Sequence, residues 1–501
     1  MCLLWQANLQ NRQAYEIATI SRSFYFPAVL GIASELLRFY NSMGRTVQEF
    51  KPIVAGEVRM YTCGPTVWNY AHVGNLRTFA FEDLLRRYLK FKGYKVTQVM
   101  NITDVEDKII KGLRDSGKTL RELTSFYEAA FMDDLDSLGI ERADLYPRAT
   151  EHIEVMVALV KALQDKGYAY AAPDGSVYFD VSRFKNYGAL SGVKLEAAKK
   201  GTRVSKDHYE EKLEAVDFAL WKSWDPDDAD VFWENELGKG RPGWHLECSA
   251  MSMKYLGESF DIHAGGLDNK FPHHENEIAQ SEAATGKKFV NYWLHSGFLT
   301  MKGEEMHKTV GNVVYLRDLF SQGWDPLTIR LFFFSARYRD GIDLTEGALE
   351  QARSQRQRLQ DFVERLTSVP AGSASKGDLS HELLSTFEAA LDDDLNTPEA
   401  MASIYTFIKR ANTLIDAGDL GGAAASSLMD ALRRINSVLG VFKFEKDALP
   451  SDLAELVERR DAARKSHDYA ESDRIRKVLL ARGIVVEDTP SGTKWKRAAA
   501  G

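Results

Sequence analysis

The stretch FPHHENEIAQSE (Phe271–Glu282) places two histidines and three carboxylates in one short segment. Proline suits the first turn of a helix, because its missing N–H would have had no intrahelical partner there. If a helix begins near Pro272, His273 and Glu277 are four residues apart and share one face. An imidazole and a carboxylate so placed could hold a zinc ion, provided that other parts of the chain supply further ligands. A capped, solvated helix whose charges bind nothing is the alternative.

Two of the three cysteines are candidates for those further ligands. Cys2, Cys63 and Cys248 are too few for a disulfide framework and favour a reducing compartment. Cys63 begins CGPTVWNYAHVGN, and Cys248 lies in GRPGWHLECSAM. With His273 and Glu277 they offer two sulfurs, a nitrogen and an oxygen, the ligand types of tetrahedral zinc sites. The spacing is not C-x-x-C, so the sequence alone does not require a shared ion.

Two other segments could bind phosphate. CGPTVWNYAHVGN joins a predicted strand to a predicted helix, where backbone N–H groups and the positive end of the helix dipole can meet an anion. His72 and Asn75 can add side-chain donors, and Gly74 permits close approach of the backbone. EEMHKTVGN carries Lys308 beyond a predicted strand of the sheet, at the edge where ligands of such folds bind. Each segment taken alone is also typical of an ordinary solvated loop.

The elements around these motifs predict a doubly wound parallel α/β sheet. Strands are expected at 58–63, 95–102, 259–266 and 291–301, with a helix at 76–91 between the first two. Residues 105–170 have helical periodicity, whereas 171–240 carry turns and short strands typical of an insertion between the halves of the sheet. From about Asp343 onward the pattern is almost wholly helical. It is interrupted by a small, polar linker, SVPAGSASKGDLS, and changes again near 442–449.

The bulk composition sets few limits on function. The chain has 501 residues, which predicts two to four domains, and its 44% hydrophobic and 27% charged residues are those of an ordinary soluble protein. A net charge of −8 gives no global sign of nucleic-acid binding, although a local basic patch would suffice. No apolar run approaches the roughly 18 residues of a membrane span, and the N-terminus is a poor targeting signal. We therefore expect a cytoplasmic protein with no membrane partner.

Together and in this order, the motifs closely resemble those of the cysteinyl-tRNA synthetases, a class I aminoacyl-tRNA synthetase family. The matching blocks run from about Leu37 to Arg497 and include MYTCGPTVWNYAHVGNLRTF, NITDVEDKII, DFALWK, GRPGWHLECSAM, FDIHAGGLDNKFPHHENEIAQSEA and DDLNTPEAM. The resemblance implies an N-terminal extension of unknown role (1–36) and a Rossmann-type catalytic domain (37–342). That domain contains the connective insertion at about 150–240. A helical bundle (343–441) and an anticodon-binding module (442–501) follow.

The resemblance assigns the metal ligands and the substrate pocket. It implies one Zn²⁺ held by Cys63, Cys248, His273 and Glu277, which recognises the thiolate of L-cysteine. His274 and Glu275 would then be neighbours of the site and not ligands. Thr66, Trp244 and His245 would border the amino-acid pocket.

The nucleotide site is implied by two signatures that both depart from the family's pattern. HVGN stands where the family usually has H-I-G-H, so His72 matches and Asn75 replaces a histidine. Residues 305–309 stand where the family has K-M-S-K-S, so Lys308 matches the second lysine and Glu305 replaces the first. His72 and Lys308 are the implied catalytic residues. The implied ATP contacts are His72, Gly74, Asn75, His263, Gly265, Asp268 and Lys308.

The implied activity is the ATP-dependent joining of cysteine to the 3′-terminal adenosine of tRNA(Cys), with Mg²⁺ as the counter-ion of ATP. In the C-terminal module Arg464, Asp473, Asp488 and Trp495 match positions that could read or stack on anticodon bases. We expect a monomer. A related ligase that joins cysteine to an amino sugar is one alternative, and a non-catalytic binding protein on the same fold is another. Charging of tRNA separates the first from the proposed activity, and cysteine-dependent ATP–pyrophosphate exchange separates the second.

Overall fold

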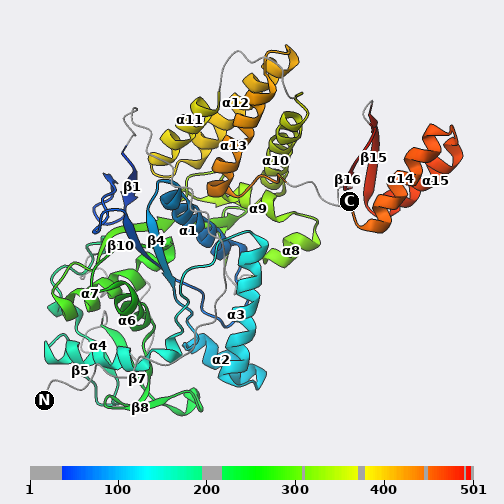
Figure 1. The fold of residues 1–501 in the computed structure, drawn as a ribbon. Helices are drawn as coiled ribbons and strands as arrows, with labels where there is room; N and C mark the ends of the chain where they lie inside the picture. The colour runs from blue at the N-terminus through cyan, green and yellow to red at the C-terminus, as the bar shows by residue number, and fades with distance from the viewer. Residues whose placement is uncertain are drawn as a thin grey trace, which may run out of the picture. The chain divides into compact units, whose positions relative to one another are not determined.

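The computed structural model describes residues 36–193, 217–306, 311–370, 379–444, 449–489 and 492–497 (Figure 1). Lys308, the N-terminal extension up to residue 35 and most of the predicted linker lie outside these residues. Within the described part of the chain, no helix has the length and apolar character needed to cross a membrane.

The centre of the catalytic region is a parallel sheet of four strands in the order β11-β10-β3-β4. Its strands are β3 (Glu57–Thr62), β4 (Lys95–Met100), β10 (Phe260–Gly266) and β11 (Val290–Ser296). Every residue of β10 is buried. Both faces of this central strand are covered, so its polar residues Asp261 and His263 are as buried as its apolar ones and are held by hydrogen bonds.

The sheet is doubly wound, as the sequence predicts. From β3 the chain passes through α1 (Val73–Phe91) to β4, and from β10 it passes through α7 (His273–Thr285) to β11, in the opposite direction across the sheet (Figure 1). Since both crossovers are right-handed in such folds, α1 and α7 cover opposite faces. The direction reverses between β3 and β10, and ligands of open α/β sheets bind beyond the carboxyl ends of the strands at that place.

The region between β4 and β10 begins with helices and continues with an antiparallel sheet. The helices are α2 (Asp107–Ser116), α3 (Leu120–Ser137), α4 (Ile153–Asp165) and α6 (Trp244–Leu256). The sheet has the order β5-β6-β7-β9-β8 and consists of β5 (Ala169–Ala171), β6 (Val177–Phe179), β7 (Phe218–Ser223), β8 (Trp233–Asn235) and β9 (Gly238–Pro242). Asp107, at the start of α2, accepts hydrogen bonds from Lys222 (2.7 Å) and Arg241 (2.5 Å), which ties this helix to the inserted sheet.

The strand predicted at 291–301 is divided. β11 ends at Ser296, and a short strand, β12 (Leu299–Met301), begins three residues later and pairs with β13 (Glu304–Glu305) and β14 (Ile342–Asp343). A side chain at Gly297 would place its Cβ 2.6 Å from the Asp340 carbonyl oxygen. Close backbone packing therefore directs the chain away from the sheet at Gly297. A small hairpin, β1 (Arg38–Asn41) and β2 (Thr46–Glu49), precedes the main sheet.

The following region is helical, as predicted. It contains α8 (Leu316–Ser321), α9 (Pro326–Phe333), α10 (Glu346–Thr367), α11 (Ser380–Asp392), α12 (Thr397–Asp416) and α13 (Gly422–Leu439). Their apolar faces share one core with the buried face of α1. The opposite face of the main sheet shares a second core with α4, α6 and the inserted strands.

The C-terminal module corrects one prediction, because it is not wholly helical. After α14 (Ser451–Lys465) and α15 (Tyr469–Ala481), the chain forms an antiparallel hairpin, β15 (Ile484–Thr489) and β16 (Gly492–Arg497). The segment that begins IVVEDT has β-branched residues and is followed by Pro-Ser-Gly, a sequence typical of hairpins. Ile484 and Val486 pack into a small core with Ile475 and Leu479 of α15, so tertiary packing stabilises the strands.

Candidate active site and metal centre

A cavity of about 770 Å³ lies beyond the carboxyl ends of β3 and β10. A ligand site is expected at this place, because the direction in which the chain winds across the sheet reverses between β3 and β10. Its wall brings together segments that are more than 200 residues apart in the sequence, and both phosphate-binding signatures contribute to it. The predicted site residues on the wall are Cys63, Thr66, His72, Gly74, Asn75, Trp244, Cys248, Asp268, His273 and Glu305.

The predicted metal ligands meet at the floor of this cavity. One donor atom from each of Cys63, Cys248, His273 and Glu277 lies within 4.8 Å of the others, and all four side chains are buried. Cys63 directly follows β3, Cys248 lies on α6, and α7 supplies the other two. The spacing of four along α7 places His273 Nε2 3.1 Å from Glu277 Oε1. The two sulfurs are 4.0 Å apart.

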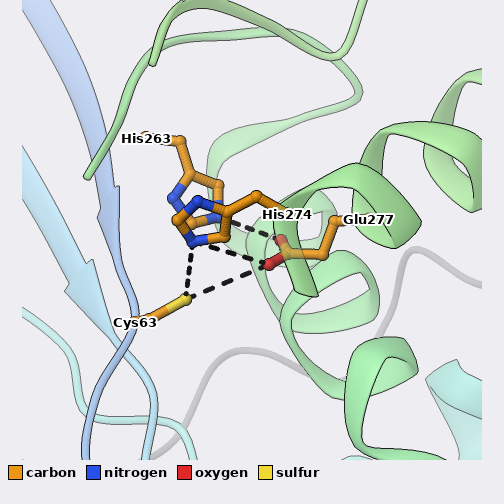
Figure 2. Close-up of side chains that lie close together, drawn as sticks. All are labelled: Cys63, His263, His274 and Glu277. Carbon is orange, nitrogen blue, oxygen red and sulfur yellow. Dashed lines mark hydrogen bonds and ion pairs between the residues drawn. The ribbon is translucent and has the colours of Figure 1, made fainter. Parts of the chain in front are cut away.

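The structure adds two histidines that the sequence did not predict as ligands. Figure 2 shows that Cys63, His263, His274 and Glu277 also point toward one another. This second group of donors satisfies the same distance limit. His274 Nε2 is 3.2 Å from Cys63 Sγ, and His263 Nε2 is 2.9 Å from Glu277 Oε2. Adjacent residues on a helix differ by about 100° in direction, so the position of His274 next to His273 gave no signal that both would face Cys63.

The cavity distinguishes the two groups. Of the described residues, Cys63, Cys248 and His273 line the cavity, whereas His263 and His274 are completely buried and do not line it. A substrate in the cavity can therefore approach a metal held by the first group. The histidines of the second group lie away from the cavity and contact Cys63 and Glu277, which both groups share.

Burial shifts the pKa values of the four candidate metal ligands. It raises the pKa of the Cys63 thiol well above its usual range and also raises the pKa values of Cys248 and Glu277. It lowers the pKa of His273 well below its usual range. The thiols and the carboxyl group are thus disfavoured as bare anions in this apolar pocket. A bound divalent cation would reverse that preference, because its charge stabilises the deprotonated ligands.

Further contacts fix the orientation of the ligand histidine. His245 Nδ1 lies 2.9 Å from His273 Nδ1, and the Trp244 ring stacks on the His273 ring with centroids 4.2 Å apart. His273 is thereby held through one ring nitrogen while the other faces Glu277. Such contacts around a metal ligand determine its tautomer and direction. His245 and Trp244, predicted to border the amino-acid pocket, therefore lie where they also support the metal cluster.

The first signature forms the start of α1. His72 is the N-cap, and its Nδ1 accepts a hydrogen bond from the Asn75 backbone N–H (3.2 Å) while Asn75 Oδ1 accepts one from the His72 N–H (3.3 Å). Since Nδ1 is an acceptor, the neutral ring carries its proton on Nε2, which can donate to a phosphate. A Cβ at Gly74 would lie 3.0 Å from His72 Nδ1, so the glycine makes room for the ring. Asn75 in place of a histidine completes this capping box.

The second signature is described in part. Glu305 and Met306 line the cavity, and the backbone carbonyl of Glu305 accepts a hydrogen bond from the Asn312 side chain (2.8 Å). Lys308 lies outside the described residues, so its predicted catalytic role stays a prediction. The negative charge of Glu305 therefore lies at the wall of the cavity, three residues before Lys308 in the sequence.

The HAGGLD segment differs in part from the expectation that it contacts ATP. Asp268 lines the cavity, but His263 is completely buried and bound to Glu277, with its ring stacked 4.6 Å from Trp293. Gly265 lies on the same face of β10 as His263, since a Cβ there would lie 3.0 Å from His274 Cε1. Residues two apart in a strand share a face, so both positions point toward α7, whereas Asp268 follows the end of the strand.

In the C-terminal module two of the four predicted residues are paired. Arg464 Nη1 lies 3.1 Å from Asp488 Oδ2, and the buried Arg460 binds the same carboxylate through both of its terminal nitrogens. Arg460 and Arg464 lower the pKa of Asp488. Trp495 packs against the small core of the module, and Asp473 is exposed on α15. Sequence reasoning missed Arg460, whose completely buried position has no signature in a charged helix.

Comparisons with known proteins decide the family. Residues 49–354 match the class I (C) tRNA synthetase catalytic domain, residues 386–443 match the DALR domain, and residues 446–495 match the cysteinyl-tRNA ligase anticodon-binding domain. The chain is 46% identical over 468 residues to the cysteine–tRNA ligase of Chlamydia pneumoniae, and 44% identical over 468 residues to that of Protochlamydia amoebophila. Both alignments cover 92% of this chain and 98% of the relative.

This chain belongs to the cysteine–tRNA ligase family. The family consists of class I aminoacyl-tRNA synthetases, and the resemblance inferred from the motifs is confirmed.

Solved structures of class I synthetases share the fold. Mycobacterium tuberculosis methionyl-tRNA synthetase in complex with methionyl-adenylate has a TM-score of 0.57 at 14% identity, covering 77% of this chain and 92% of that one. An Agrobacterium radiobacter leucyl-tRNA synthetase in a ternary complex with tRNA has a TM-score of 0.56 at 10% identity, covering 78% and 85%. At such low identity these likenesses support the α/β fold of this cysteine–tRNA ligase family member and nothing finer.

Proposed function

We propose that this chain activates L-cysteine with ATP and transfers the cysteinyl group to the 3′-terminal adenosine of tRNA(Cys). The observation that carries the proposal is the position of the buried Cys63, Cys248, His273 and Glu277 cluster at the floor of the cavity that His72 also lines. A sulfur-recognising centre and a phosphate-binding helix start therefore face one space. The curated relatives of similar length are named cysteine–tRNA ligases, which supports the same activity.

The donor set fits one zinc ion. Two thiolates, an imidazole and a carboxylate that converge within 4.8 Å are ligands that zinc takes, and the paired sulfurs disfavour harder ions such as Mg²⁺. Bound there, Zn²⁺ would supply a Lewis acid that prefers a thiolate sulfur to the hydroxyl of serine.

The residues of the chain would position the reactants for the first step. The carboxylate of cysteine attacks the α-phosphate of ATP, which gives cysteinyl-adenylate and releases pyrophosphate. Because this carboxylate is already ionised, no protein base is required. His72 Nε2–H and the N-terminus of α1 would stabilise charge on the phosphates, together with Lys308 and the Mg²⁺ that accompanies ATP. Asp268, which lines the same cavity, is our candidate for holding the adenosine. Catalysis by positioning and charge stabilisation is typical of phosphoryl and nucleotidyl transfer.

In the second step the cysteinyl group passes from the adenylate to a hydroxyl of the terminal adenosine of the tRNA, and AMP leaves. We propose that Arg464, Asp473, Asp488 and Trp495 contribute to anticodon recognition, through a module that matches the cysteinyl-tRNA ligase anticodon-binding domain. We also propose the domain division 37–342, 343–441 and 442–501, and a monomeric, cytoplasmic enzyme.

Two assays test the proposal. The wild-type protein should exchange pyrophosphate into ATP when cysteine is present and should do so far less with serine. It should then attach cysteine to tRNA(Cys). Failure of the exchange would indicate a non-catalytic protein, and exchange without charging of tRNA would indicate a ligase with another acceptor.

A charge change at the second signature tests the departure at Glu305. Replacing this carboxylate with a cation beside the triphosphate should lower the KM for ATP, and a change of about 1 kcal/mol corresponds to about five-fold. Glu305→Gln is the matched control, because it removes the negative charge and adds no cation. An unchanged KM in Glu305→Lys would mean that this side chain does not face the phosphates.

A further inference from the structure

A cluster of aromatic side chains lies at the edge of the cavity, on the side of α3 and α8. Tyr70, which lines the cavity, is surrounded edge-to-face by Phe126 (6.1 Å between ring centroids), Tyr127 (5.3 Å) and Tyr315 (6.0 Å). Tyr315 pairs through its backbone with His72, so the cluster continues directly from the first signature. We call these four residues the aromatic rim.

The rim is accompanied by positive charge. The Arg317 guanidinium lies 3.4 Å from the Tyr70 ring centre, and Lys118 Nζ lies 5.1 Å from that of Phe126. Lys108 and Lys111 of α2, both exposed, line the same cavity. Acidic groups are also present: Asp115 lines the cavity, and Asp134 lies 3.8 Å from Arg317. Of these charged groups, Arg317 and Lys118 are the ones that lie over the rings of the aromatic rim.

The exposure of Phe126 is not explained by folding. Phe126 is 49% exposed, whereas Leu123 and Phe131 on the same helix are 4% and 2% exposed. Those two residues belong to the buried side of α3, and Phe126 lies outside it. A half-exposed aromatic ring beside long cationic side chains is the arrangement on which unpaired nucleotide bases stack, while the cations neutralise their phosphates.

We propose that the aromatic rim is the docking surface for the unpaired 3′ nucleotides of the tRNA. The inference rests on the proposed function, since the second step brings the terminal adenosine into this cavity. The nucleotides that precede it must then cross the edge of the cavity. At that edge the aromatic rim places the half-exposed ring of Phe126 beside cations and is continuous with His72. Stacking tolerates any base, so this surface orients the 3′ end without reading its sequence.

The test compares two substitutions of one side chain. Phe126→Leu keeps an apolar group of similar size but removes the flat ring, and Phe126→Trp keeps a stacking surface. The readout is kcat/KM for tRNA in cysteinylation divided by the rate of cysteine-dependent pyrophosphate exchange. Since one stacked base contributes about 1–3 kcal/mol, Phe126→Leu should lower this ratio about 10-fold, and Phe126→Trp should restore most of it.

A matched control is available on α6. Tyr255 is 38% exposed with Lys254 Nζ 5.4 Å from its ring centre, and neither residue lines the cavity. Tyr255→Leu should leave the ratio at the wild-type value. Binding of a tRNA that lacks its unpaired 3′ nucleotides supplies a second comparison. Wild type and Phe126→Leu should bind that truncated tRNA equally.

Three results would overturn the proposal. The first is an unchanged ratio in Phe126→Leu while the wild type charges tRNA normally, which would leave the proposed function intact. The second is an equal decrease in affinity for intact and truncated tRNA, because the ring would then touch another part of the molecule. The third is a change in oligomeric state caused by Phe126→Leu, which would make the rim a contact between copies. Absence of charging by the wild type would instead refute the proposed function.

Discussion

The floor of the cavity and the aromatic rim at its edge differ in burial and in the kind of interaction that their side chains make. The floor consists of Cys63, Cys248 and His273, with the completely buried Glu277 beside them; all four are less than 10% exposed and could hold one ion. The aromatic rim consists of edge-to-face rings, of which Phe126 is half exposed, with the cationic side chains of Lys118 and Arg317 beside them. Buried polar groups are costly unless every partner is in place, whereas exposed stacking contacts contribute independently. Changes at the floor should therefore act all-or-none, and changes at the rim should be graded.

The largest effect is expected from a floor ligand. Cys63→Ser should abolish stoichiometric zinc binding and lower kcat/KM for cysteine in pyrophosphate exchange by more than about 100-fold, since removing a mere partner of a ligand already costs about 10–100-fold. Metal analysis of the untagged protein and exchange with cysteine and serine would measure both. Cys2→Ser, at the third cysteine of the chain, is the control. A variant that kept its metal and its preference over serine would refute the metal centre.

A smaller effect is expected from His245, which contacts the predicted ligand His273. His245→Ala removes the neighbour 2.9 Å from His273 Nδ1 and should weaken zinc affinity about 10–100-fold. Competition with a chromogenic chelator measures this without reference to activity. His152→Ala, which removes a histidine bound to Tyr255, should leave the affinity unchanged. Wild-type affinity in His245→Ala would mean that Trp244 and Glu277 alone orient the ligand.

Graded behaviour at the rim is tested through salt. Lys111→Ala and Lys118→Ala should each lower kcat/KM for tRNA only a few-fold, and each should make its logarithm less steep against the logarithm of salt concentration. The slope should change by about 0.7 for each phosphate that the lysine neutralises in the wild type. Lys254→Ala is the control with the same charge change. Slopes identical to the wild type would remove the lysines from the RNA-binding surface.

The smallest effect on catalysis is expected from Asp134, a buried residue 3.8 Å from Arg317. Its substitution should instead have a measurable effect on stability. Burial raises the pKa of Asp134 to about 6 from 3.8, although Arg317 opposes the change. The folded state thus disfavours the carboxylate, and the contribution of this group to the free energy of unfolding falls as the pH rises from about 4 to 6. Each pH unit between the two pKa values corresponds to about 1.4 kcal/mol, so Asp134→Asn should be at most about 3 kcal/mol more stable at pH 8.

Urea unfolding at pH 4 and pH 8 checks this sign. The advantage of Asp134→Asn should be present at pH 8 and should largely vanish near pH 4, where the native carboxyl group is also protonated. An advantage of the same size at both pH values would mean that packing, and not the charge of Asp134, is responsible.

Local patterns in the sequence determined much of this molecule. The spacing of four between His273 and Glu277 places both on one helical face wherever that helix lies, and the strand–helix order around Cys63 predicts a parallel sheet with a site at its carboxyl edge. The shared helical face and the parallel sheet are confirmed by the geometry, and a cavity lies at the predicted edge. The final hairpin was missed because the charged, helical α14 and α15 dominate the composition of that segment.

Only the tertiary structure decided which groups meet across long sequence separations. His263 lies against Glu277 and His274 against Cys63, because β10 and α7 pack beside β3, and no spacing within either segment encodes that contact. The aromatic rim likewise joins Tyr70, Phe126 and Tyr315 from three separate elements. The physical reason is the range of the forces: backbone periodicity fixes directions within one helix or strand, whereas the close packing of several elements fixes the neighbours of each side chain.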